Sequence, residues 1–105
     1  MTKLYVITRR DLSPGQQAVQ SCHALQEFNL DHPGITKDWH ASSNTLALLS
    51  VGGELDLEAL AQSAEAKWIA VSRFREPDRN NELTAIVLGP EGRRLVQRLP
   101  LTLAS

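Results

Sequence analysis

Apolar residues follow two patterns along the chain: short continuous runs, and repeats spaced three and four residues apart. The runs predict strands at Leu4–Thr8, Thr45–Val51, Trp68–Phe74 and Leu83–Leu88. The helical spacing predicts helices from Pro14 to Asn29 or Leu30, from Leu57 to Ala66 and from Arg93 to Leu99. This order of elements indicates an α/β fold in which helices pack on a mixed sheet.

Local signals predict where the helices begin and end. Ser13 is a good N-cap and Pro14 suits the first helical position, whereas His32-Pro33-Gly34 stops the same helix. Asp56 is expected to cap the second helix. The polar segment from 35 to 44 has no clear period, so no element is predicted there.

Length and composition limit the class of protein. A chain of 105 residues allows one domain, spanning 1–105, because it is too short for a second core. Apolar residues make up 42% and charged residues 22%, which disfavours disorder and coiled coils. The net charge of −1 argues against sequence-blind coating of nucleic acid or lipid.

The charges are nevertheless distributed unevenly. Two short stretches, Arg9-Arg10 and Arg73 to Arg79, hold five of the 11 basic residues. Acidic residues gather around one predicted helix, at Glu54, Asp56, Glu58 and Glu65. We therefore expect a locally basic side, suited to a local contact with nucleic acid, and an acidic side elsewhere.

The single cysteine and the N-terminal residues suggest a reducing compartment. Cys22 alone forms neither an internal disulfide nor a four-thiolate zinc site, so a cytoplasmic location is expected. The apolar run before Arg9 is too short for a signal peptide or a membrane span, so no membrane association is expected.

The first predicted helix combines a polar stripe with an apolar one. Gln16, Gln20, His23 and Glu27 fall on the polar stripe, and Ala18, Cys22, Leu25 and either Phe28 or Asn29 fall on the stripe expected to face the core. His23 is therefore either a site residue or a packed or solvated histidine. Cys22 points about 100° away from His23, which disfavours a Cys–His nucleophile. We expect Cys22 to be a core thiol instead, because a free cysteine packs as a small apolar residue.

A second candidate region is the loop between the last two predicted strands. Residues 73 to 84 combine charges of both signs, two amides and a proline, which is more than a connecting turn requires. The loop is either part of a site or a solvated hairpin loop.

These residues resemble a known family. Arg9-x-Asp11-Leu12, a glycine-containing turn and Ala18-x-Gln20-x-x-His23-Ala24 are similar to the N-terminal signature of type 2 peptidyl-tRNA hydrolases. The strand from Thr84 to Leu88 with Gly89-Pro90 resembles the closing strand of that family.

The resemblance implies a single-domain three-layer α/β/α fold with a four-stranded mixed sheet, and hydrolysis of the ester that joins a peptide to the 3′ end of tRNA. It implies tRNA as partner and neither metal nor organic cofactor. The candidate catalytic residues are His23, Glu76 and Asp78, with His23 as general base or orienter of water and one of the two carboxyls as the acid. The candidate substrate-binding residues are Arg9, Arg10, Asp11, Gln16, Gln20, Arg75 and Thr84.

Departures from the family pattern keep a second hypothesis open. Ser13-Pro14-Gly15-Gln16 replaces a Lys-Gly-Lys turn, so the family lysine is missing and Gln16 occupies its neighbourhood; five arginines could compensate, at 9, 10, 73, 75 and 79. The alternative function is a catalytically lapsed member that binds tRNA or a protein. An exposed tryptophan, Trp39 or Trp68, would further indicate a homodimer surface.

Overall fold

The computed structural model describes residues 2–104, so Met1 and Ser105, the two ends of the predicted domain, lie outside the described residues. The strands are β1 (Lys3–Arg9), β2 (Thr45–Val51), β3 (Val71–Glu76) and β4 (Glu82–Leu88). The α-helices are α1 (Pro14–Asp31), α2 (Pro33–Ser42), α3 (Glu54–Ala66) and α4 (Arg93–Val96), and short 3₁₀ turns follow as η1 (Pro77–Arg79) and η2 (Pro90–Gly92). No helix within residues 2–104 is long and apolar enough to cross a membrane.

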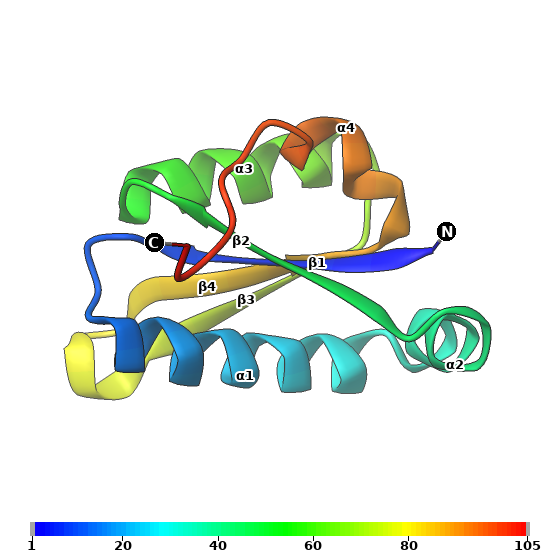
Figure 1. The fold of residues 1–105 in the computed structure, drawn as a ribbon, viewed down its shortest axis with the longest axis horizontal. Coiled ribbons are helices and arrows are strands. Elements are labelled where there is room, and N and C mark those ends of the chain that lie inside the picture. Colours follow the sequence, from blue (N-terminus) through cyan, green and yellow to red (C-terminus); the bar gives the residue numbers. More distant parts are fainter. Residues whose placement is uncertain (1, 105) are drawn as a thin grey trace.

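The four strands form one mixed sheet in the order β2-β1-β4-β3. β1 runs parallel to β2, and β4 runs antiparallel to both β1 and β3. Helices α1 and α2 cover one face of the sheet and α3 and α4 the other (Figure 1). The expected three-layer α/β/α architecture is confirmed, and the carboxyl ends of β1 and β3 meet at the same edge of the sheet.

Two apolar cores lie on the two faces of the sheet. Leu4 and Val6 of β1 pack toward α1, and Tyr5 and Ile7 pack toward α3. Because β1 is buried on both sides, its central residues, 4–7, are consecutive apolar residues, which is why its position was predictable.

Helix α1 begins as predicted and is followed directly by a helix that was not predicted. The Ser13 hydroxyl accepts the Gln16 backbone N–H at 3.3 Å, and Pro14 occupies the first turn. Pro33, expected only to stop α1, also starts α2, since proline fits the first turn of a helix. The prediction that residues 35 to 44 form no helix or strand was therefore wrong. This helix has only about one apolar residue per turn, which is too few to produce a clear helical period.

Helix α3 and strand β3 differ from their predicted bounds. Gly53 is the N-cap of α3, and Asp56 lies in the first turn, where its carboxylate accepts the Gly53 N–H at 3.1 Å. After Ala66 the chain makes a turn that uses Trp68, so β3 begins at Val71 rather than at Trp68. Helix α4 ends three residues before the predicted Leu99.

The buried side of α1 also differs from the expectation. Its buried residues are Gln17, Gln20, Ser21, Ala24 and Phe28. Cys22, expected in the core, is exposed, and so is Ala18. The apolar anchors Ala24 and Phe28 set the rotation of the helix, and polar side chains then turn inward because they find buried partners.

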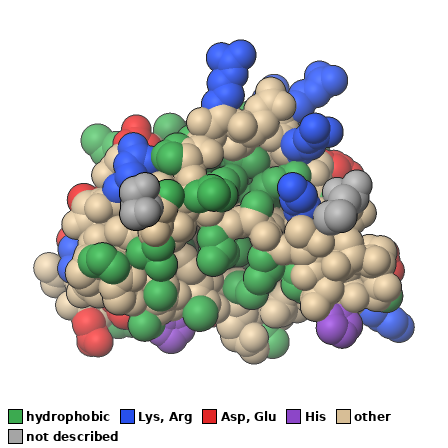
Figure 2. All heavy atoms as spheres, viewed as in Figure 1, with side chains coloured by type: hydrophobic (Ala, Val, Ile, Leu, Met, Phe, Trp, Pro, Cys, Tyr) green, Lys and Arg blue, Asp and Glu red, His purple; other side chains and the backbone are tan. Residues whose placement is uncertain are grey.

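The segment after α4 pairs with the outer edge of β2. The Ser50 N–H donates to the Pro100 carbonyl at 2.9 Å, and the Thr102 N–H donates to the Leu48 carbonyl at 2.8 Å. Figure 2 shows apolar side chains gathered over this side of the molecule. The exposed leucines of β2 and of this tail are Leu46, Leu48, Leu101 and Leu103.

Candidate functional site

A hollow of about 400 Å³ opens where the first turns of α1 meet the end of β3 and η1. It is lined by Gly15, Gln16, Val19, Gln20, Glu76, Asp78 and Arg79. Four residues predicted for the site, Gln16, Gln20, Glu76 and Asp78, are therefore brought together from distant parts of the sequence.

A chain of hydrogen bonds runs from the sheet into this hollow. The Thr84 hydroxyl, fully buried on β4, donates to Gln20 Oε1 at 2.6 Å. The Gln20 Nε2 donates to Glu76 Oε1 at 3.0 Å. Gln20 is only 4% exposed, so both ends of its amide need partners, and both are satisfied.

These hydrogen bonds determine how the Glu76 carboxylate is held. Because Thr84 donates to the amide oxygen, the amide nitrogen of Gln20 points toward the Glu76 carboxylate. Within residues 2–104 no side chain or backbone group hydrogen-bonds to Glu76 Oε2. Glu76 is therefore a carboxylate held at one oxygen and able to accept a proton or hydrogen bond at the other.

His23 lies one turn further along α1 and does not line the hollow. Its exposed ring stacks on the half-buried ring of Phe74, with the ring centroids 4.6 Å apart and the planes at 16°. Neither ring nitrogen of His23 has a hydrogen-bond partner among the described residues. Phe74 was not singled out from the sequence, although strand periodicity places it on the same face as Glu76.

Arg9 and Asp11 belong to a neighbouring ion-pair network. The Arg9 guanidinium, almost fully buried, donates to both Asp11 oxygens at 3.0 and 2.9 Å and to Glu82 Oε1 at 2.8 Å. Its hydrogen bonds, first that to Asp11, raise the pKa of Arg9, and they lower the pKa of Asp11 and of Glu82. These three charges join the end of β1 and the turn after it to the start of β4, and none of the three residues lines the hollow.

The other candidate arginines lie away from the hollow. Arg73 pairs with Glu58 at 3.1 Å and with Glu65 at 2.8 Å, and Arg75 pairs with Glu58 at 2.9 Å, all on the α3 face of the sheet. Arg10 donates to the Ser50 carbonyl at 3.1 Å. The expected separation into a basic site and an acidic helix is therefore wrong, because the acidic helix neutralises the arginines of β3.

Arg79 supplies the positive charge of the hollow. Its Nε lies 3.6 Å from Glu82 Oε1, and its side chain is 35% exposed. No group of three potential metal ligands is found within residues 2–104. The hollow thus offers two carboxylates, two side-chain amides and one guanidinium.

Comparison with known proteins adds a fold relative and a family. A solved structure of a protein of unknown function from Agrobacterium tumefaciens strain C58 superposes with a TM-score of 0.67 at 13% identity, over 95% of this chain and 96% of that chain, which supports the fold alone. No curated protein is similar enough to match. The sequence profile of the family described as peptidyl-tRNA hydrolase PTH2 matches residues 2–104. The chain therefore belongs to the PTH2 family of peptidyl-tRNA hydrolases.

Proposed function

We propose that this protein hydrolyses the ester between a peptide and the 3′ end of tRNA, and that Glu76 activates the attacking water. The observation that carries this proposal is the hydrogen-bond chain from Thr84 through Gln20 to Glu76, which ends in an open hollow of a family member. A cytoplasmic location agrees with this substrate, because peptidyl-tRNA is produced by translation.

Ester hydrolysis needs a base for water and donors for the oxyanion. Glu76 takes a proton from a water, whose oxygen attacks the ester carbonyl carbon. The carbonyl oxygen becomes an oxyanion that Gln20 Nε2, through its second hydrogen, and the Gln16 amide stabilise. The oxyanion then reforms the carbonyl, the bond to the ribose oxygen breaks, and the proton on Glu76 passes to that leaving oxygen.

Arg79 and His23 bind the substrate. Arg79 replaces the missing family lysine as the cation of the hollow and binds a phosphate near the tRNA 3′ end. The exposed face of His23, backed by Phe74, provides a flat surface on which the terminal base stacks. His23 then acts as a positioning residue rather than as the base suggested by the resemblance.

The test is single-turnover hydrolysis of peptidyl-tRNA by the wild type and by Glu76→Gln. The variant keeps an acceptor for Gln20 but loses the basic carboxylate, so the rate should fall about 10²- to 10⁴-fold. The matched control is Glu27→Gln, which removes the same charge from α1 outside the hollow and should leave the rate unchanged.

Two results would contradict the proposal. If the wild type leaves peptidyl-tRNA intact at high enzyme concentration but binds tRNA in a salt-dependent way, the protein is the lapsed binding module instead. If the wild type hydrolyses the ester and Glu76→Gln is equally fast, the base lies elsewhere.

A further inference from the structure

Two hollows lie on either side of the tail that follows α4, and Leu101 borders both of them. The hollow on the α4 face of the sheet has a volume of about 350 Å³, and the hollow beside the start of α1 has about 450 Å³. Leu101 is 64% exposed and Leu103 is 52% exposed. The two hollows and the exposed leucines of the tail and of β2 form the tail surface. Exposed apolar patches of this kind are typical of sites where another molecule binds.

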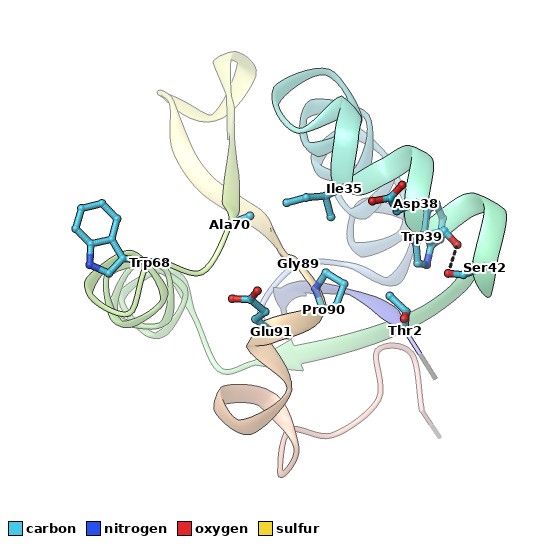
Figure 3. Close-up of a pocket in the computed structure, with 10 residues that line it drawn as sticks. All are labelled: Thr2, Ile35, Asp38, Trp39, Ser42, Trp68, Ala70, Gly89, Pro90 and Glu91. Carbon is cyan, nitrogen blue, oxygen red and sulfur yellow. Dashed lines mark hydrogen bonds between the residues drawn. The ribbon is translucent and has the colours of Figure 1, made fainter.

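The charged residues that line these two hollows are all cations. Lys3 and Arg93 line the hollow on the α4 face, and Arg10 lines the other. No Asp or Glu of the described residues lines either hollow. The hollow between α2 and η2, of about 380 Å³, is lined instead by Asp38 and Glu91 (Figure 3). The tail surface is therefore both apolar and positively charged.

None of these cations has an ion-pair partner within residues 2–104. The side chains of Lys3 and Arg93 form no hydrogen bond there, and the Arg10 guanidinium donates only to the carbonyl and hydroxyl of one β2 serine, at 3.1 and 3.3 Å. Arg94 and Arg98, in α4 and just after it, are exposed and also unpaired among the described residues. Figure 2 shows Lys and Arg side chains over α4 beside the apolar side chains of the tail surface. A complementary partner carries negative charge next to apolar groups.

We propose that the tail surface binds an acidic amphipathic segment of a partner protein. The apolar side chains of this segment enter the hollows on the two sides of Leu101, and its carboxylates face Lys3 and Arg93. RNA fits the surface less well, because RNA bases stack on aromatic rings rather than on leucines. A second copy of the chain would set like charges against one another across a two-fold axis. Binding here does not depend on the proposed hydrolysis, because none of these residues lines the hollow beside Glu76.

The test is an NMR titration of the isotope-labelled full chain with three short blocked peptides. The first peptide combines leucine and glutamate, the second has glutamine in place of glutamate, and the third has serine in place of leucine. We expect the first peptide to cause saturable shifts of backbone amide signals in the tail and β2. The second and third peptides, at the same ionic strength, should bind at least about tenfold more weakly.

Two variants and two matched controls test the residues of the tail surface. Leu101→Ser removes the apolar side chain shared by both hollows and should weaken binding of the first peptide about tenfold. The double substitution Lys3→Gln with Arg93→Gln leaves the tail intact and should weaken binding about tenfold at low salt and less at high salt. The controls, Leu55→Ser and Lys67→Gln, remove an exposed leucine and an exposed cation outside both hollows and should leave binding unchanged.

Four outcomes would overturn the proposal. The first is no saturable shift with the leucine–glutamate peptide, and the second is an equal loss of binding in the two controls. The third is saturable binding of phosphatidylglycerol vesicles or of an RNA hairpin at the same signals without binding of the peptide, since the partner would then be lipid or nucleic acid. The fourth is a wild-type dimer, seen by light scattering, that Leu101→Ser converts to a monomer, since the surface would then serve a second copy of the chain.

Discussion

Gln20 connects the stability of the protein with its chemistry. Its amide is almost fully buried, and its two ends are bound by Thr84 and Glu76. A carboxylate at this position would face Glu76 with the same charge and would lose the donor that holds it. Only an amide both accepts from the hydroxyl and donates to the carboxylate in this geometry.

Replacing Gln20 with leucine should therefore reduce both stability and hydrolysis. The buried Thr84 hydroxyl loses its closest acceptor, so the free energy of unfolding should fall by about 1–3 kcal/mol in urea denaturation. The matched control is Gln17→Leu, because the Gln17 amide is also buried and donates to the Leu12 carbonyl at 2.8 Å, outside the hollow. The control should lose similar stability but keep its rate per folded molecule. Equal rate losses would show that Gln20 acts only through folding.

Two substitutions of His23 distinguish a stacking role of its ring from a role as the catalytic base. His23→Phe keeps a flat ring against Phe74 and removes both ring nitrogens, whereas His23→Ala removes the ring. We expect His23→Phe to retain the wild-type rate and His23→Ala to raise KM about tenfold or more, as stacking on a base is worth about 1–3 kcal/mol. A His23→Phe variant as slow as Glu76→Gln would instead identify His23 as the base.

At the scale of elements, the strands were easier to predict than the helices. β1 and β4 are buried on both faces, so each contains a run of four consecutive apolar residues, 4–7 and 85–88, that is visible in the sequence. The side of α1 that is buried was not predictable, because polar residues such as Gln20 face inward and Cys22 faces solvent. The side-chain partners of Gln20 come from β3 and β4, more than fifty residues later, so the chain around α1 does not reveal them.

The arrangement of the site residues was also not predictable, because it depends on contacts between residues far apart in the sequence. The family motif led to Gln16 and Gln20, and the mixed-charge loop led to Glu76 and Asp78, but their meeting depends on β1 and β3 ending at one edge. The arginines looked like one basic cluster because sequence does not show that alternate residues of β3 face opposite sides. Arg73 points to α3, whereas Phe74 points to α1.

The end of α3 should become more stable when Trp68, which has a left-handed backbone (φ 59°) and a 92% exposed side chain, is replaced by glycine. A left-handed conformation costs a non-glycine residue about 1–2 kcal/mol, and the greater freedom of glycine in the unfolded chain offsets part of this, so a net gain of about 0.5–1 kcal/mol is expected. Thermal unfolding of Trp68→Gly and of a Trp68→Ala control, which keeps the strain, measures the difference. A lower melting temperature for the glycine variant would mean that the indole packs against the fold.

At the scale of the whole molecule, the Arg9 network makes the fold sensitive to acid. Hydrogen bonds from Arg9 hold the pKa of Asp11 below its usual 3.8 and that of Glu82 below its usual 4.5. A carboxyl whose pKa is lower in the folded state stabilises the fold above its unfolded pKa and loses this contribution as the pH falls through the folded value. The contribution is therefore fully present at neutral pH and is lost below about 4.5.

Urea denaturation at a series of pH values between neutral and 3 should show this loss. The variant Glu82→Gln removes one of the two titrating partners, so its stability should be lower at neutral pH and should fall less steeply in acid. The control is Asp78→Asn, a carboxyl outside the network. Identical acid profiles for Glu82→Gln and the wild type would show that this pair does not contribute.

The tail that follows α4 limits strand pairing between copies of the protein, because it covers part of the edge of the sheet. An open sheet edge presents unpaired backbone groups that can join the strands of another molecule. On the outer strand β2 the tail already takes part of these groups, through Ser50 and Thr102 and the antiparallel bridge of Leu49 with Leu101. On the other outer strand, β3, charged side chains are anchored to α3. The protein thus protects itself against continuous sheets and fibres, and two copies that meet over β2 would do so through leucine side chains and not through shared strands.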